Sequence, residues 1–131
     1  MLAGRIDTRS CDGPILLVDD NADMREAIAL DLESIGFTVR VAANGDEGLL
    51  AAREAPRPCA ILLDLMMPVM DGWTFRERQL ADPELRDIPV IVFSARGDAD
   101  RQGRALRAAA ALEKPVDLDK LHQLFEHLRA A

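Results

Sequence analysis

The sequence predicts an α/β fold in which a doubly wound, five-stranded parallel sheet carries helices on both faces. The main observation is that short apolar runs alternate five times along the chain with segments that favour helices, a pattern typical of such sheets. The first run, residues 14–20, is apolar until its acidic end, as expected for a strand buried on both faces. The length of 131 residues, 49% of them hydrophobic, fits one domain with a substantial core.

The first half of the chain contains two predicted strand–helix pairs. Residues 14–20 (PILLVDD) predict a strand, and residues 22–35 predict an amphipathic helix that Gly36 ends. The apolar residues of this helix recur at spacings of four, four and three: Met24, Ile28, Leu32 and Ile35. Residues 37–43 (FTVRVAA) alternate like a strand, and residues 44–55 favour a helix that the following prolines end.

The second half contains three more pairs. Residues 59–65 (CAILLDL) predict the third strand, and a helix is expected over residues 73–80. Residues 87–95 (DIPVIVFSA) predict the fourth strand, which a short fourth helix and a brief strand at residues 110–113 follow. The last helix, residues 118–128, has one apolar face that predicts core packing: Leu118, Leu121, Phe125 and Leu128.

The composition limits the expected partners and location. A net charge of −7 argues against binding nucleic acid through a general positive field. The N-terminus has no apolar core of signal-peptide length, and no apolar run is long enough to cross a membrane. Cys11 and Cys59 have neither the spacing of a zinc site nor that of a disulfide framework, so we expect two reduced thiols in a cytoplasmic protein. Residues 1–12 are predicted to form a flexible leader before a domain over residues 13–131.

Polar residues lie at the ends of the predicted strands. Asp19 and Asp20 end the first, Asp64 ends the third, Ser94 lies at the end of the fourth, and Lys114 follows the fifth. Right-handed crossovers place the carboxyl ends of parallel strands on one rim of the sheet, where sites form at the switch in strand order. The sequence therefore predicts that three acids, a hydroxyl and an ammonium group meet on this rim.

These groups suit phosphoryl chemistry on a carboxylate. Three neighbouring carboxylates repel one another unless a cation lies among them, and oxygen ligands on an open rim favour Mg²⁺. With the metal held mainly by two acids, the third can act as a nucleophile. Lys114 is one of only two lysines among 16 basic residues, and with the metal it would neutralise a transferring phosphoryl group.

The motifs that carry these groups resemble those of response-regulator receiver domains of two-component signalling. The segments LLVDDN, LLDLMMPVMDG, VFSA and EKP occur in the order of that family, each at a predicted strand end, and the similarity runs from about Pro14 to Leu128. The resemblance implies the flavodoxin-like fold of CheY-like receivers. It also implies that Asp64 is the phospho-acceptor, and that Ser94 is the hydroxyl that moves toward the phosphoryl group.

The resemblance further implies a metal site and a lysine partner. By it, Asp20 binds Mg²⁺ directly, Asp19 binds it through water, and Asp64 and the backbone carbonyl of Met66 complete the protein ligands. Lys114 would pair with the phosphoryl group, and a cis peptide bond to Pro115 would direct its side chain into the site.

The chain departs from the family pattern at Ala111, where receivers usually have the aromatic residue of the conformational switch. The chain has no tyrosine, so output is expected to use another route. Arginines recur on the predicted fourth helix and just before it: Arg96, Arg101, Arg104 and Arg107. They are compatible with a surface for an acidic partner or with an ordinary solvated face.

The function we expect is that of a stand-alone bacterial receiver with no output domain. It would take a phosphoryl group from a histidine kinase or a phosphotransfer protein onto Asp64, and then bind a downstream protein or act as a phosphorelay shuttle or sink. We expect no enzymatic activity beyond its own phosphorylation and dephosphorylation, no direct binding of nucleic acid or membrane, and a monomer or weak dimer. One alternative is an interaction module that works without phosphorylation. Another is a phosphatase of the haloacid-dehalogenase type, but that family needs a second Asp where this chain has Met66.

Overall fold

The chain forms one parallel sheet of five strands with a helix after each strand. The structure is a computed structural model and describes residues 13–67, 69–94, 97–114 and 116–130. The strand order is β2-β1-β3-β4-β5, and every neighbouring pair is parallel. The strands are β1 (Ile15–Val18), β2 (Val39–Ala42), β3 (Ala60–Asp64), β4 (Val90–Ser94) and β5 (Ala110–Glu113). The helices are α1 (Ala22–Ser34), α2 (Gly45–Arg53), α3 (Gly72–Ala81), α4 (Ala99–Ala105) and α5 (Leu118–Ala130).

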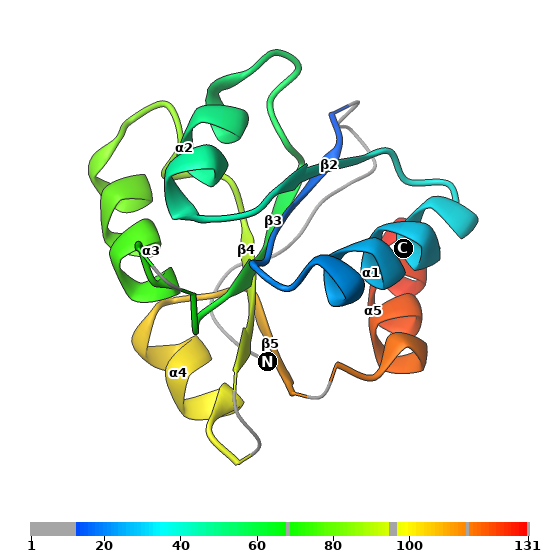
Figure 1. Cartoon of the computed structure of the whole chain (residues 1–131). Coiled ribbons are helices and arrows are strands. Elements are labelled where there is room, and N and C mark those ends of the chain that lie inside the picture. The colour runs from blue at the N-terminus through cyan, green and yellow to red at the C-terminus, as the bar shows by residue number, and fades with distance from the viewer. Residues whose placement is uncertain (1–12, 68, 95–96, 115, 131) are drawn as a thin grey trace.

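The helices cover the two faces of the sheet in separate groups. α1 and α5 lie on one face, and α2, α3 and α4 lie on the other (Figure 1). Each face has its own core, because neighbouring residues of a strand point to opposite sides. Leu16 and Leu63 pack toward α2 and α3, whereas Leu17 and Leu62 pack toward α1 and α5. The predicted fold class is confirmed.

The three inner strands are buried throughout, as their apolar sequences predict. Every residue of β1, β3 and β4 is buried, whereas the edge strands β2 and β5 are partly exposed. All ten predicted elements are present, but several predicted strands are too long at their ends. Asp19 and Asp20, for example, lie beyond β1 in the loop that leads to α1. In the sheet, the strand order switches between β1 and β3, and the three acids lie at or just after the ends of these two strands.

Side-chain caps fix where three of the helices begin. Asn21, Asn44 and Asp71 precede α1, α2 and α3, and each accepts a hydrogen bond from a backbone N–H in the first turn, which satisfies a donor that the helix leaves unpaired. Gly36 follows α1 with φ of 98°, a conformation that glycine adopts readily, as the prediction that it ends the helix requires. α4 has no such side-chain cap.

Some expectations from the sequence are wrong or fall outside the described residues. Cys59 is disulfide-bonded, so the expectation of a reduced thiol there is wrong; Cys11 lies outside the described residues. The predicted leader, Arg96 and Pro115 also lie outside them, and the domain limits stay a prediction.

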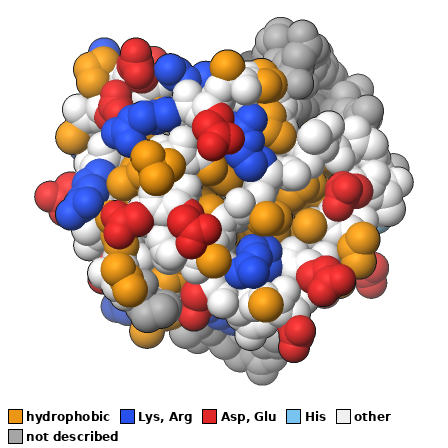
Figure 2. Space-filling view, turned by 45° about the horizontal axis from the view of Figure 1, so that its top comes forward, with side chains coloured by type: hydrophobic (Ala, Val, Ile, Leu, Met, Phe, Trp, Pro, Cys, Tyr) orange, Lys and Arg blue, Asp and Glu red, His pale blue; other side chains and the backbone are white. Residues whose placement is uncertain are grey.

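Among the described residues, no helix is both long and apolar enough to cross a membrane. On the face shown in Figure 2, acidic, basic and hydrophobic side chains are interspersed.

Candidate functional site: a carboxylate cluster at the strand ends

Three carboxylates meet where the strand order switches. Asp64 is the last residue of β3, and Asp19 and Asp20 follow its neighbour β1. One carboxylate oxygen from each lies within 4.8 Å of the other two. Asp19 and Asp64 are each only 2% exposed, whereas Asp20 is exposed. The predicted convergence of these acids is therefore present, with two buried carboxylates and one that faces solvent.

The loop after β1 holds Asp19 from both its side chain and its backbone. Its Oδ1 accepts a hydrogen bond of 2.9 Å from the N–H of Asn21, the residue that also caps α1. Arg25, one turn into α1, donates from Nη1 to the backbone oxygen of Asp19 at 2.7 Å. The start of α1 therefore positions the carboxylate that follows β1.

The loop after β3 holds Asp64 in a similar way. Its Oδ1 accepts a hydrogen bond of 3.0 Å from the N–H of Met66. At the other end of the loop, the N–H of Gly72 donates to the oxygen of Leu65 at 3.0 Å. A Cβ at Gly72 would lie 2.8 Å from the backbone oxygen of Asp64 and closer still to Leu65, so only glycine lets α3 begin this near the end of β3.

Lys114, which directly follows β5, reaches the buried carboxylate of Asp64 at the same rim of the sheet. Its Nζ lies 2.6 Å from Oδ1 of Asp64 and 5.9 Å from the centre of the Phe93 ring. Its backbone N–H donates to the oxygen of Ser94 at 2.6 Å, one residue beyond the pairing of β4 with β5. The ammonium group therefore compensates the charge of Asp64, as its place in the sequence predicted.

The pKa of Asp19 shows the electrostatic strain of this cluster. Burial raises the pKa of Asp19 from 3.8 to about 6, and the charge of Asp64 and a hydrogen bond with Asp64 contribute to this rise. The N–H of Asn21 and the charge of Lys114 act in the opposite direction and offset part of this rise. Two carboxylates this close resist being ionised together unless a cation joins them.

This shift predicts how the stability of the metal-free protein depends on pH. Between about pH 4 and pH 6 the folded protein holds a proton on Asp19 that the unfolded chain has lost, so the free energy of unfolding falls as the pH rises through this window. A difference of about two between the pKa of Asp19 in the folded protein and in the unfolded chain corresponds to at most ~3 kcal/mol. We therefore expect Asp19→Asn to raise the free energy of unfolding at pH 7 by about 2 kcal/mol. Urea unfolding at pH 4 and pH 7 in the presence of a chelator measures both effects. The same pH slope in Asp19→Asn as in the wild type would refute the assignment to Asp19, and Asp87→Asn, at an exposed loop position, is the control.

The donor set of the cluster fits a hard divalent cation. All of its members offer carboxylate oxygens, and one of them faces solvent, which matches the preference of Mg²⁺ for a few carboxylates and retained water. In the part of the chain that the structure describes, this is the one group of three or more acidic, histidine or cysteine side chains arranged to hold a metal ion. The backbone carbonyl of Met66 stays a prediction as a further ligand, and this residue is 62% exposed.

The remaining predicted residues lie near this cluster or on α4. Ser94 ends β4 and is 2% exposed. Ala111 lies opposite Val92 in the pairing of β5 with β4, half-buried against the core under α2 and α3. Three of the predicted basic residues are exposed on α4 or just after it: Arg101, Arg104 and Arg107. Arg101 forms an ion pair with Asp98, so part of the positive charge of this stripe is compensated.

Sequence reasoning missed several residues that support the site. Asn21 could have been found as the polar residue before a predicted helix. Arg25 could not, because an arginine on a helix occurs in many solvated positions, and the sequence places Gly72 only at the turn into the third predicted helix. Their roles depend on backbone atoms that only the folded chain brings near them.

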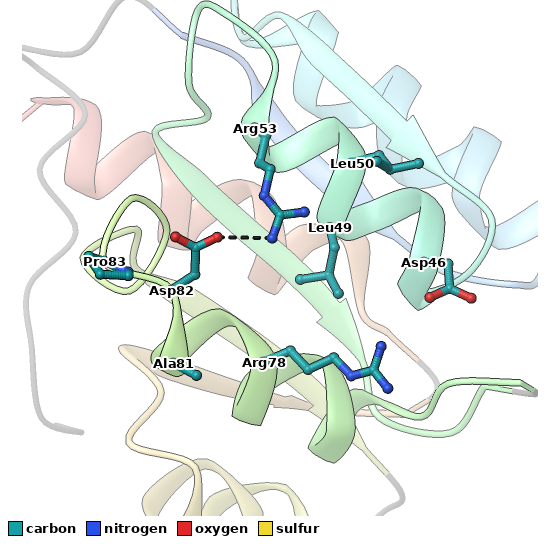
Figure 3. A pocket seen from close by; sticks show the side chains of 8 residues that line it. All are labelled: Asp46, Leu49, Leu50, Arg53, Arg78, Ala81, Asp82 and Pro83. Carbon is teal, nitrogen blue, oxygen red and sulfur yellow. Dashed lines mark hydrogen bonds and ion pairs between the residues drawn. The ribbon is translucent and has the colours of Figure 1, made fainter.

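A separate open groove lies between α2 and α3 (Figure 3). It has a volume of about 740 Å³, and the ion pair between Arg53 and Asp82, 2.9 Å long, crosses one end of it (Figure 3). Its lining consists of Asp46, Leu49, Leu50, Arg53, Arg78, Ala81, Asp82 and Pro83. None of the carboxylates of the cluster lines this groove, so the two features are distinct.

Comparisons with known proteins agree with this geometry. The family model described as response regulator receiver domain matches residues 15–126. The chain is 36% identical over 119 residues to Response regulator Rre1 of Synechocystis, covering 88% of this chain and 51% of that protein. It is 38% identical over 118 residues to Transcriptional regulatory protein PrrA of Mycobacterium tuberculosis, covering 88% of this chain and 49% of that protein. The chain thus spans about half the length of these curated relatives.

Solved structures give the same result. A response regulator receiver protein from Pseudomonas putida superposes with a TM-score of 0.79 at 30% identity, covering 90% of this chain and 98% of that chain. The chemotaxis response regulator CheY4 of Vibrio cholerae superposes with a TM-score of 0.78 at 26% identity, covering 88% of this chain and 98% of that one. With its carboxylate cluster at the switch in strand order, the chain belongs to the response regulator receiver domain family.

Proposed function

We propose that this receiver domain accepts a phosphoryl group on Asp64 from a phosphohistidine of a histidine kinase or phosphotransfer protein. One carboxylate oxygen of Asp64 forms a bond to phosphorus while the phosphorus–nitrogen bond to the donor breaks, and its electron pair stays on the imidazole. The result is an acyl phosphate on the domain and an unmodified histidine on the donor. The chemistry is an established use of carboxylates as nucleophiles.

The observation that carries this proposal is the environment of Asp64. Its carboxylate lies at the end of a central strand, 2% exposed, with the Lys114 ammonium 2.6 Å away and two further carboxylates beside it. A purely structural core would gain nothing from burying two acids side by side, because desolvation and repulsion both oppose it. The arrangement has a use if charge is added to Asp64 and neutralised there.

The neighbouring residues then have separate roles. Asp19, Asp20, Asp64 and the carbonyl of Met66 would hold Mg²⁺, which supplies positive charge to phosphoryl oxygens. Lys114 would stay near Asp64 and pair with the transferred group. Ser94, at the end of the adjacent strand β4, would donate its hydroxyl to a phosphoryl oxygen.

The output and the location belong to the same proposal. The added phosphoryl group changes the charge of the rim, which can alter how the domain binds another protein. We therefore place the function in protein contact, with a downstream protein target or a phosphorelay partner. Phosphohistidine donors of this kind obtain their phosphate from ATP, so the domain would work in the cytoplasm.

Incubation of the wild-type protein with acetyl phosphate and Mg²⁺ tests the proposal without a cognate kinase. We expect the intact mass to increase by one phosphoryl group that hydroxylamine removes, as it does from acyl phosphates, and we expect a chelator to prevent the gain. Borohydride reduction of the phosphorylated protein followed by peptide mapping should locate the modification at Asp64. No incorporation, or a modification mapped to another residue, would overturn the proposal.

A further inference from the structure

Two side chains of α3 bind α4 by hydrogen bonds. Nε1 of Trp73 donates to Oε1 of Gln102 in the middle of α4, at 2.7 Å. Arg76, one turn further along α3, donates from Nε to the backbone oxygen of Leu106 and from Nη2 to that of Arg107, both at 2.9 Å. α3 therefore holds α4 at its centre and at its C-terminal end, and the two helices are neighbours on one face of the sheet (Figure 1).

The contact of Arg76 is well suited to fix the end of a helix. Arg76 is 6% exposed, and its remaining described bond goes to Oε1 of Gln79 at 2.8 Å. The last carbonyl groups of a helix lack partners within the helix and form the negative end of its dipole. Arg76 donates to the carbonyl groups of Leu106, the C-cap residue of α4, and of Arg107, the residue after it. It brings a positive charge to this end of the helix from a buried position, where water does not readily replace its bonds.

The other end of α3 is joined to the acceptor loop. The N–H of Gly72, the first residue of α3, donates to Leu65, which directly follows Asp64. The missing side chain of Gly72 keeps the two segments in contact. Trp73 is the next residue, so a shift of the loop that follows Asp64 displaces the residue that binds α4.

α4 has little stability of its own as a helix. It has only seven residues and includes Gly103, which weakens a helix by about 1 kcal/mol relative to alanine. Its N-cap residue, Asp98, makes no side-chain capping bond, because its carboxylate instead accepts bonds from the side chains of Arg101 and Gln102. Gln102 therefore links Trp73 to the start of the helix as well. Elements with so little stability of their own are the ones that open or move most easily.

We propose that phosphorylation of Asp64 is transmitted to α4 through α3, by way of the Trp73–Gln102 hydrogen bond, with Arg76 holding the far end of α4 to the same helix. This inference rests on the proposed function and adds the route by which the site controls a surface. The route needs no aromatic residue at position 111, where this chain has a methyl group. The surface that responds is that of α4, with its exposed arginines.

Hydrogen exchange of α4 tests this route. The hydrogen-exchange rates of the backbone amides of residues 99–105 are measured with and without Mg²⁺ and fluoroberyllate, which together form a stable mimic of the acyl phosphate. Incorporation of phosphate from acetyl phosphate is measured in parallel. We expect fluoroberyllate to change the exchange of α4 in the wild type. In Trp73→Phe, which keeps a ring but loses the donor, and in Gln102→Leu, which loses the acceptor, the change should shrink about threefold or more, as expected for loss of one coupling hydrogen bond. Gln123→Leu makes the same substitution at an exposed position of α5 and should respond like the wild type.

The outcomes separate this inference from the proposed function. Failure of the wild type to incorporate phosphate would overturn the proposed function and this inference with it. Incorporation together with an unchanged α4 in the wild type, or with an α4 response of full size in both Trp73→Phe and Gln102→Leu, would overturn the inference alone. Thermal unfolding of both variants shows that they are folded, and incorporation at the wild-type rate shows that the acceptor site is intact.

Discussion

Replacement of Asp64 by asparagine is expected to abolish phosphate incorporation from acetyl phosphate, with a residual rate at least ~100-fold below that of the wild type. The amide cannot form a stable acyl phosphate, and no other carboxylate among the described residues has the Lys114 ammonium beside it in a buried position. Asp20 is exposed, and Asp19 carries a proton more readily because burial and Asp64 raise its pKa to about 6. Neither has the Lys114 ammonium at 2.6 Å, as Asp64 has.

The structure of Asp64→Asn should stay intact, which makes the result interpretable. The side-chain oxygen of asparagine can still accept the 3.0 Å bond that Met66 donates to Asp64, and removal of one of two neighbouring charges relieves repulsion with Asp19. Asp87→Asn, in an exposed loop, provides the matched control and should incorporate phosphate like the wild type. Incorporation by Asp64→Asn at more than a tenth of the wild-type rate would show that another residue accepts the phosphoryl group.

The sequence predicted the fold and the main acids because both depend on local patterns. Continuous apolar runs identify buried strands, and the common direction of parallel strands brings residues at their carboxyl ends to one rim. Asp19, Asp64 and Lys114 could therefore be placed together from their positions alone, and the structure confirms that they meet. The exact strand ends were less predictable, since the pairing of neighbouring strands rather than composition decides where each one stops.

The supporting contacts could not be predicted, because they join residues far apart in the sequence through backbone atoms. Arg76 binds carbonyl groups about 30 positions away, and nothing in its neighbourhood distinguishes it from an exposed helical arginine. Trp73 lies against the core, and its indole N–H also binds Gln102, 29 positions further along the chain. The sequence left open whether the arginines of α4 form a surface for an acidic partner or a solvated face, and the folded chain pairs one of them, Arg101, with Asp98.

Replacement of Lys114 by methionine, which is similar in length but uncharged, is expected to slow phosphate incorporation about 100-fold, the usual cost of removing one group that stabilises developing charge. It should also lower the free energy of unfolding at pH 7 without Mg²⁺ by about 1 kcal/mol, because Asp64 is buried while Lys114 is partly exposed and its pairing is screened. Mg²⁺ should offset this loss, since it brings another positive charge to the same carboxylates.

The chain contains its own control: Lys120, the other lysine, is exposed on α5, and Lys120→Met should behave like the wild type in both assays. Initial rates of mass gain and urea unfolding measure the two effects, and an incorporation rate for Lys114→Met within twofold of that for Lys120→Met would mean that Asp64 reacts without help from this ammonium group.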